Sequence, residues 1–256
     1  MTSQSETVTT ALRALVCLDL TNLEESCTAE DVAQLCARGQ TPHGSVAAVC
    51  VWPRFVTEAA GALAHTGVKV ATVVNFPEGA EDVQEVLAAT EQAIADGADE
   101  IDLVIPYREV LAGNAAIVEE FVAEVSDACG ETTLKAILET GKLKSPYLIR
   151  DAAERALRGG ADFLKTSTGK VAVNATPEAA EVMLTAIRTA GGSAGFKAAG
   201  GVRTLEDAKT YLDLCDRMMG QGWAGPKHFR IGASGLLDAL LAALDGVDSP
   251  SSDDNY

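Results

Sequence analysis

Charged residues stand inside five apolar segments of this 256-residue sequence. They are Asp19 in Leu-Val-Cys-Leu-Asp-Leu, Asp102 in Glu-Ile-Asp-Leu-Val-Ile, Lys135 in Thr-Leu-Lys-Ala-Ile-Leu, Lys165 in Asp-Phe-Leu-Lys-Thr-Ser and Lys197 in Gly-Phe-Lys-Ala-Ala. An unpaired buried charge is strongly unfavourable, so such residues persist where they are paired or used. Ion pairs across the interior would explain any single one of them. Three lysines and two aspartates that converge on one space favour a catalytic interior.

A buried lysine close to other lysines is expected to have a lowered pKa, because burial and like charge both disfavour its protonated form. Its free amine can attack a carbonyl and form a Schiff base, an electron sink for making or breaking a carbon–carbon bond. Lys165 is the best candidate, since it lies within a strand, whereas Lys170 follows in a loop open to water. We expect Lys197 to depress the pKa of Lys165 and Asp102 to pass protons.

The segments that carry these residues alternate along the whole chain with helix-like stretches. Strand candidates are 15–20, 45–51, 69–75, 100–105, 133–139, 162–167, 195–199 and 228–233, and helix candidates include 29–38, 55–65, 83–96 and 116–129. Because strand starts recur about every 30 residues, the alternation predicts parallel pairing through right-handed crossovers.

Eight such units predict an α/β fold, a (β/α)8 TIM barrel that forms a single catalytic domain over residues 1–245. Residues 246–256, rich in Ser and Asp, are expected to form a mobile tail that ends in Tyr256. An open doubly wound sheet is the alternative. Its Gly-x-Gly-x-x-Gly turn is absent after the first strand, because residues 18–23 contain no glycine.

Composition excludes several classes of protein. With 20 Lys+Arg against 37 Asp+Glu, the net charge of −17 argues against nucleic-acid binding and against anionic membranes. No apolar run is long enough for a membrane helix, and no signal-peptide pattern is present, so we expect a cytoplasmic protein. Six cysteines without CxxC spacing indicate buried reduced thiols, and three scattered histidines offer little for a metal site. The sequence is compatible with a homodimer but does not determine the number of subunits.

Two glycine-rich turns indicate what the substrate carries. Residues 200–203 follow the seventh strand and residues 232–235 follow the eighth, where barrels commonly bind phosphate through backbone N–H groups. A single such turn is weak evidence, because glycine is also used there for conformational reasons. Both turns together favour a phosphate site, and Lys170, Lys197 and Arg203 would attract an anion to it.

The sequence resembles the deoxyribose-phosphate aldolases, a class I aldolase family of barrel enzymes, over nearly its whole length. The most specific motif is Lys165-Thr166-Ser167-Thr168-Gly169. The other segments that carry the resemblance are Asp19-Leu20-Thr21, Cys50-Val51-Trp52-Pro53-Arg54-Phe55, Asn75-Phe76-Pro77, Gly97-Ala98-Asp99-Glu100-Ile101-Asp102, Pro106-Tyr107-Arg108, Glu139-Thr140-Gly141, Gly195-Phe196-Lys197 and Gly200-Gly201-Val202-Arg203.

This resemblance implies cleavage of 2-deoxy-D-ribose 5-phosphate to acetaldehyde and D-glyceraldehyde 3-phosphate, with no metal and no organic cofactor. It makes Lys165 the Schiff-base lysine, with Lys197 and Asp102 as the activating and proton-relay pair. Asp19, Thr21 and Lys135 would bind the sugar, and the C-terminal Tyr256 would assist proton transfer. The implied phosphate-binding residues are Thr168, Gly169, Lys170, Gly201, Val202, Arg203, Gly232 and Ser234.

Two positions depart from the family pattern. Ala198 stands where proline is expected, which should loosen the following loop. Gly235 stands where a second serine is common, so one hydroxyl donor to the phosphate is missing. The alternatives are another phosphosugar barrel enzyme, such as a transaldolase-like transferase or an isomerase, and a catalytically silent phosphate-binding barrel.

Overall fold

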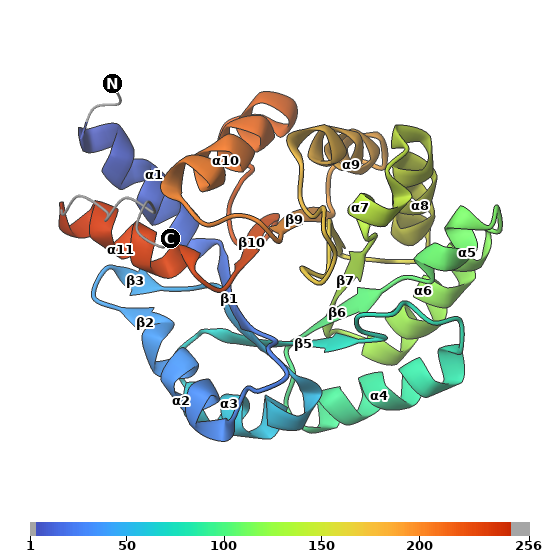
Figure 1. Ribbon diagram of the computed structural model, residues 1–256, viewed down its shortest axis with the longest axis horizontal. Helices are drawn as coiled ribbons and strands as arrows, with labels where there is room; N and C mark the ends of the chain where they lie inside the picture. The colour runs from blue at the N-terminus through green and yellow to red at the C-terminus, as the bar shows by residue number, and fades with distance from the viewer. Residues whose placement is uncertain (1–3, 247–256) are drawn as a thin grey trace.

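Eight parallel strands close into a barrel in the computed structural model, which describes residues 4–246. The barrel strands are β1 (Leu18–Asn22), β4 (Ala48–Val51), β5 (Lys69–Val74), β6 (Glu100–Val104), β7 (Thr133–Ile137), β8 (Phe163–Lys165), β9 (Gly195–Ala199) and β10 (Phe229–Ala233). Neighbours follow the order β1-β10-β9-β8-β7-β6-β5-β4, and β1 also pairs with β4, which closes the ring (Figure 1). The predicted TIM barrel is therefore confirmed, and every predicted strand overlaps an observed one.

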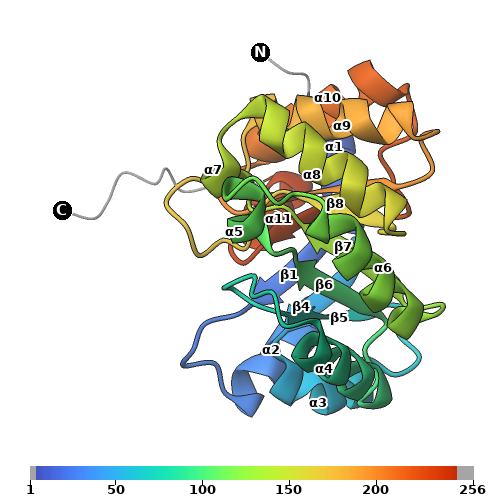
Figure 2. The same ribbon diagram turned by 90° about the vertical axis from the view of Figure 1, so that its right-hand side faces the viewer.

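Helices surround the strands, as the two ribbon views show (Figures 1 and 2). They are α1 (Gln4–Val16), α2 (Ala29–Arg38), η1 (Pro53–Phe55), α3 (Val56–Leu63), α4 (Val83–Ala95), α5 (Tyr107–Leu111), α6 (Ile117–Cys129), α7 (Thr140–Leu143), α8 (Pro146–Arg158), α9 (Pro177–Thr189), α10 (Leu205–Met219) and α11 (Leu236–Asp245). A short hairpin of β2 (Gln40–Thr41) and β3 (Gly44–Ser45) precedes β4. The four helix predictions correspond to α2, α3, α4 and α6.

The first strand begins later than predicted. Leu15 belongs to helix α1, and the strand starts at Leu18. Ala11, Ala14 and Leu15 are all fully buried, and their spacing of three and four residues is that of one helix face. This face packs α1 against α11 and α10, at the side of the barrel where the chain begins and ends (Figure 1).

Successive residues of each strand point to opposite faces, which separates an apolar layer from a charged interior. Ile101 and Leu134 belong to the large apolar cluster shared with the helices, whereas their neighbours Asp102 and Lys135 point the other way and contact each other. Beside the charges, β4 and β5 contribute small apolar residues to a second cluster. It consists of Leu23, Ala48, Cys50, Ala71 and Val73.

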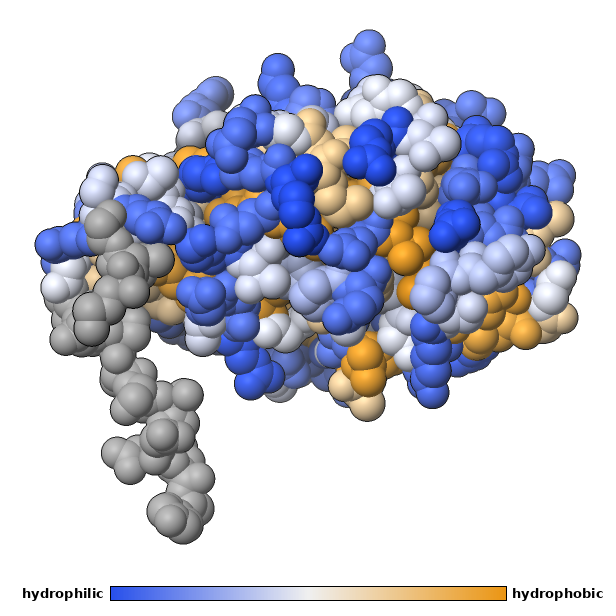
Figure 3. Space-filling view, turned by 90° about the horizontal axis from the view of Figure 1, so that it is seen from above, coloured by the Kyte–Doolittle hydropathy of each residue, from blue (hydrophilic) through white to orange (hydrophobic). Residues whose placement is uncertain are grey.

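The remaining general expectations concern cysteines and the surface. All six cysteines are free thiols and buried, as predicted. Hydrophilic side chains cover most of the face shown in Figure 3, with apolar areas scattered between them. Within residues 4–246, no helix combines the length and apolar character needed to cross a bilayer. Tyr256 and nearly all of the predicted tail lie outside the described residues.

Candidate active site

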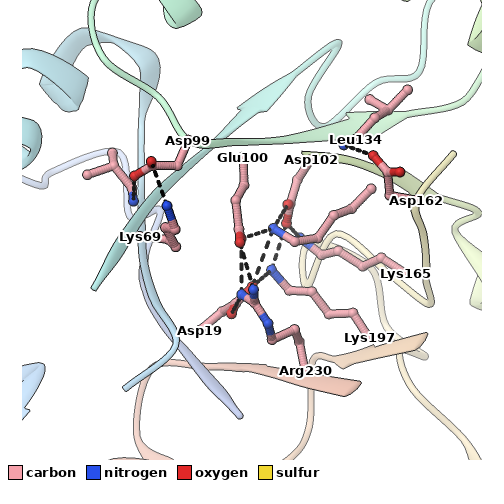
Figure 4. Close-up of polar contacts among 12 residues, drawn as sticks. Asp19, Lys69, Asp99, Glu100, Asp102, Leu134, Asp162, Lys165, Lys197 and Arg230 are labelled. Atoms are coloured by element: carbon pink, nitrogen blue, oxygen red, sulfur yellow. Dashed lines mark hydrogen bonds and ion pairs between the residues drawn. The ribbon is translucent and has the colours of Figure 1, made fainter. Parts of the chain in front are cut away.

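Two lysines and one carboxylate meet inside the barrel (Figure 4). The Nζ of Lys165, the last residue of β8, donates to Oδ2 of Asp102 at 2.6 Å, and the Nζ of Lys197 donates to the same oxygen at 2.7 Å. Lys165 and Lys197 are direct register partners of β8 and β9, so their side chains share one face. All three residues are buried, with Lys165 4% exposed and the other two 0%. The structure therefore brings together the three residues that the sequence predicted as the chemical centre.

Lys135 lies beside this centre and holds the other oxygen of the same aspartate. Its Nζ donates to Oδ1 of Asp102 at 2.8 Å and lies 2.6 Å from Oε2 of Glu100 and 3.6 Å from Oδ2 of Asp19. Its side chain is completely buried. Both oxygens of Asp102 are thus occupied by ammonium groups, which fixes the orientation of its carboxylate.

Two residues of this network were missed by the sequence analysis. Arg230 in β10 donates to Oδ1 of Asp19 at 2.7 Å and to both oxygens of Glu100, at 2.6 and 3.0 Å. Glu100 and Arg230 are 3% and 6% exposed. The signal used for the other five, a charge within an apolar segment, would have found Arg230 in Phe-Arg-Ile. It does not mark Glu100, which follows Asp99 at the start of its strand.

The three lysines differ in pKa because they have different partners. Burial lowers the pKa of Lys165, Lys197 lowers it further, and the single contact with Asp102 does not offset them. Burial also acts on Lys197, but Asp102 and Asp19 outweigh it and raise its pKa. The pKa of Lys135 is likewise raised, because the carboxylates around it outweigh burial. The expectation that a lysine buried near other lysines has a lowered pKa therefore holds for Lys165. For Lys197 and Lys135 it is wrong, because the neighbouring carboxylates give both a raised pKa.

The carboxylate of the centre, Asp102, has a lowered pKa. Burial alone would raise the pKa of Asp102, but Lys135, Lys165 and Lys197 hold it well below its ordinary value. Asp102 can therefore accept a proton only when a neighbouring group gives up its positive charge.

Asp19 and Thr21, predicted to face the sugar, are the second and fourth residues of β1, so their side chains lie on the same face of the strand. The carboxylate of Asp19 is 0% exposed and is held by Lys197 at 2.5 Å and by Arg230. The hydroxyl of Thr21 donates to the backbone oxygen of Asp19 at 2.8 Å and is half-buried. Their role in sugar binding stays a prediction.

Seven of the eight predicted phosphate-binding residues follow β8, β9 and β10, which are neighbours in the barrel, and Gly232 lies within β10 itself. Their loops therefore meet at one part of the rim. Gly200 and Gly201 have φ of 83° and 88°, which only glycine adopts without strain. The N–H of Gly200 donates to the backbone oxygen of Gly232 at 3.5 Å. Arg203 and Ser234 are exposed there, whereas Val202 is buried.

Two residues of the first of these loops already have partners in the chain. The Thr168 hydroxyl donates to Oε2 of Glu139 at 2.5 Å, and the Nζ of Lys170 donates to the backbone oxygen of Leu23 at 2.8 Å. Glu139, another buried carboxyl that the sequence analysis did not single out, has a φ of 54°, and burial raises its pKa. No local sequence signal marks that backbone conformation.

Glycine at position 232 has a steric reason as well. A Cβ atom there would lie 3.0 Å from Cε of Lys197 and 3.1 Å from Cβ of Ala199. Gly232 therefore leaves room for the lysine side chain. Ala198 and Ala199 are the last two residues of β9, so Ala198 itself belongs to the strand and not to a loop. Its effect on the loop that follows stays a prediction.

Within residues 4–246, no group of three or more His, Cys, Asp or Glu side chains is arranged to hold a metal ion. The chemistry available in this interior is that of a buried amine beside a shared carboxylate.

Comparison with known proteins identifies the family. Residues 13–239 match the DeoC/LacD family aldolases. The chain is 54% identical to the deoxyribose-phosphate aldolase of Agrobacterium fabrum (strain C58) over 249 residues, which cover 96% of each protein. A crystal structure of a candidate deoxyribose-phosphate aldolase from Toxoplasma gondii ME49 is similar, with a TM-score of 0.85 and 30% identity over 96% of this chain and 98% of that one. A tetrameric deoxyribose phosphate aldolase from Aeropyrum pernix, at 24% identity and a TM-score of 0.73 over 94% and 98% of the two chains, shares the fold. The chain therefore belongs to the DeoC/LacD aldolase family.

Proposed function

We propose that the protein is a deoxyribose-phosphate aldolase that cleaves 2-deoxy-D-ribose 5-phosphate reversibly to acetaldehyde and D-glyceraldehyde 3-phosphate. The observation that carries this proposal is the buried amine of Lys165, whose pKa is lowered and whose single carboxylate partner is shared with Lys197. The 54% identity to an aldolase of that name supports the substrate.

The reaction would use the amine as the nucleophile. Neutral Lys165 attacks C1 of the open-chain sugar, and loss of water yields the imine. A base removes the C3 hydroxyl proton, the C2–C3 bond breaks, and its electron pair forms an enamine as the imine nitrogen accepts electrons. Protonation at C2 and hydrolysis release acetaldehyde and the lysine. Asp102 and Lys197, which share a hydrogen bond at 2.7 Å, can carry the protons between these steps.

The rim loops would bind the phosphate, and the inner residues would orient the sugar. Asp19, Thr21 and Lys135 are the proposed sugar-binding residues, and Tyr256 is proposed to assist proton transfer. The proposed phosphate-binding residues are Thr168, Gly169, Lys170, Gly201, Val202, Arg203, Gly232 and Ser234. The backbone N–H groups of Gly201 and Val202, together with the cations Lys170 and Arg203, suit a dianion.

Borohydride trapping tests this proposal directly. We expect reduction in the presence of 2-deoxyribose 5-phosphate or acetaldehyde to inactivate the enzyme and leave a two-carbon adduct on Lys165, located by peptide mapping. An adduct on Lys170 or Lys197 would keep the reaction class and change the nucleophile. No adduct in folded protein would reject the aldolase mechanism and leave an isomerase or a silent binding barrel, while dependence on a ketose donor would indicate a transferase.

Substitution Gly235→Ser should strengthen phosphate recognition. Gly235 is exposed, has an unstrained φ of −108°, caps the N-terminus of α11, and a Cβ there meets nothing within 4 Å. A serine hydroxyl at this helix N-terminus can add one hydrogen bond to the phosphate, so KM should fall by about tenfold or less with kcat unchanged. Cleavage of unphosphorylated 2-deoxyribose is the control. An equal change for both sugars would show that position 235 does not contact phosphate.

We also propose that the protein works in the cytoplasm as a homodimer. Six buried free thiols suit a reducing compartment. Leu12 and Val16 lie four residues apart on α1, and each is 39% exposed. Light scattering should give about twice the 26.6 kDa of one chain, and Leu12→Glu should reduce it towards a single chain because a buried charge disfavours an apolar interface. A wild-type protein of monomeric mass would contradict the homodimer.

A further inference from the structure

Six of the buried charges form a closed ring that alternates in sign. Following the contacts, the order is Arg230, Asp19, Lys197, Asp102, Lys135, Glu100 and back to Arg230. Every link is 2.5 to 2.8 Å long. Three cations and three carboxylates make the ring electrically neutral. Lys165 stands outside it and touches it only at Asp102.

Neutrality of the ring matters because its members are buried in a medium of low polarity. A net charge there is strongly unfavourable unless a neighbouring group neutralises it. With the ring balanced, none of its three carboxylates is left to compensate a proton on Lys165. Outside the ring, the buried carboxyl of Glu139 also interacts with Lys165, but burial raises the pKa of Glu139 and so disfavours its negative charge. The neutral amine that imine formation requires is then the favoured state of Lys165.

Arg230 closes the ring on the side away from the reacting amine. Its guanidinium holds Glu100 through two hydrogen bonds and also donates to Asp19 and to the backbone oxygen of Pro226. The guanidinium of Arg230 also lies over the aromatic ring of Phe163, 5.6 Å from the ring centroid. Phe163 stands two residues before Lys165 in β8. Among the described residues, Arg230 contacts neither Lys165 nor Asp102, so its influence on them passes through Asp19 and Glu100.

We propose that Arg230 is a positioning residue of the aldolase site, which with Glu100 completes a neutral ring and so keeps the amine of Lys165 uncharged. This inference rests on the proposed Schiff-base function. It assigns a role to two residues that do not touch the substrate. Removal of the positive charge of Arg230 should favour the protonated form of Lys165, and removal of the negative charge of Glu100 should disfavour it.

The test compares variants that change the charge of the ring in opposite directions. Arg230→Gln leaves the ring with one excess negative charge, which favours a proton on Lys165. Glu100→Gln leaves one excess positive charge, which disfavours it. The double variant Arg230→Gln/Glu100→Gln restores neutrality without the original ion pair. The readouts are the pH profile of kcat/KM and the pH dependence of trapping of acetaldehyde on Lys165 by cyanoborohydride.

We expect Arg230→Gln to move the acidic limb of both profiles up by about one pH unit. At a pH below that limb, this shift corresponds to a loss of about tenfold in kcat/KM and in the rate of trapping. Glu100→Gln should move it down, and the double variant should return it close to the wild-type position. A purely structural role would lower kcat or stability in each variant without shifting the limb in opposite directions.

Two further variants protect the test against misfolding. Arg230→Lys keeps the charge and loses the bidentate contact, so its pH profile should match the wild type even where its Tm is lower. Arg217→Gln breaks an exposed pair with Glu181 and should change neither profile. If the single ring variants do not fold, Arg230→Lys and the double variant decide the question, because a shifted limb in either would overturn the proposal.

The outcomes separate this inference from the proposed function. Absence of trapping on Lys165 in the wild type would reject the Schiff-base mechanism itself. Trapping in the wild type together with unshifted or equally shifted limbs in the two single variants would overturn the role of the ring alone.

Discussion

Lys165→Arg is expected to lower kcat/KM by about four orders of magnitude or more, because removal of a covalent nucleophile removes the whole reaction path. Arginine can still donate to Asp102, but it carries a positive charge that the neutral amine of Lys165 lacks. It does not lose its proton at any working pH, so it cannot form an imine. The measurement is the rate of acetaldehyde release from 2-deoxyribose 5-phosphate, together with borohydride trapping, which should leave the variant unmodified.

The matched control is Lys209→Arg. Lys209 lies on α10 and pairs with Asp213 at 2.5 Å at the surface. The same substitution there should leave turnover and trapping at wild-type levels. Appreciable activity in Lys165→Arg would instead point to an isomerase, which needs no covalent lysine.

Asp102→Asn is expected to damage both turnover and stability. The carboxylate accepts hydrogen bonds from Lys165, Lys197 and Lys135 with its two oxygens, and an amide offers only one acceptor and no charge. Leaving buried ammonium groups without their counter-ion should lower the free energy of unfolding by about 3–5 kcal/mol. Loss of the proton carrier should lower kcat by about 10²–10⁴-fold.

Thermal unfolding and steady-state kinetics measure these two effects. A loss of that size corresponds to a fall in Tm of about 10 °C for a chain of this length. Asp238→Asn is the control, because Asp238 pairs with Arg38 at the surface and both side chains are largely exposed. A variant with wild-type Tm and wild-type kcat would show that the shared carboxylate is neither a structural counter-ion nor a proton carrier.

Local sequence patterns were sufficient to predict the barrel and most of its strands. Apolar segments between turn residues alternate with helix-like spacing, and this pattern depends on neighbouring residues alone. The exception was the start of the first strand. A buried apolar residue at position 15 is compatible both with a strand and with the buried face of α1. Only its packing against α11 and α10 distinguishes these alternatives.

The chemical centre was predictable for a similar reason. A charge between apolar neighbours is visible in the sequence, and Lys165, Lys197 and Asp102 were identified by it. Arg230 also stands between apolar neighbours, whereas Glu100 follows Asp99 and carries no such signal. Glu139 carries no such signal, because its burial follows from a backbone conformation that the local sequence does not specify.

By itself, the sequence determined the barrel, the family and the residues that enter the interior. Only the tertiary structure decided which charges meet: Lys165 lies 63 residues from Asp102, Lys197 lies 178 from Asp19, and Arg230 lies 211 from Asp19. Strand register and closure of the barrel bring these residues within hydrogen-bond distance. All three lysines lie in similar apolar strands, yet their pKa values move in different directions because the number of carboxylates around each one differs. That number is a property of the closed barrel, since the carboxylates come from strands that are distant in sequence.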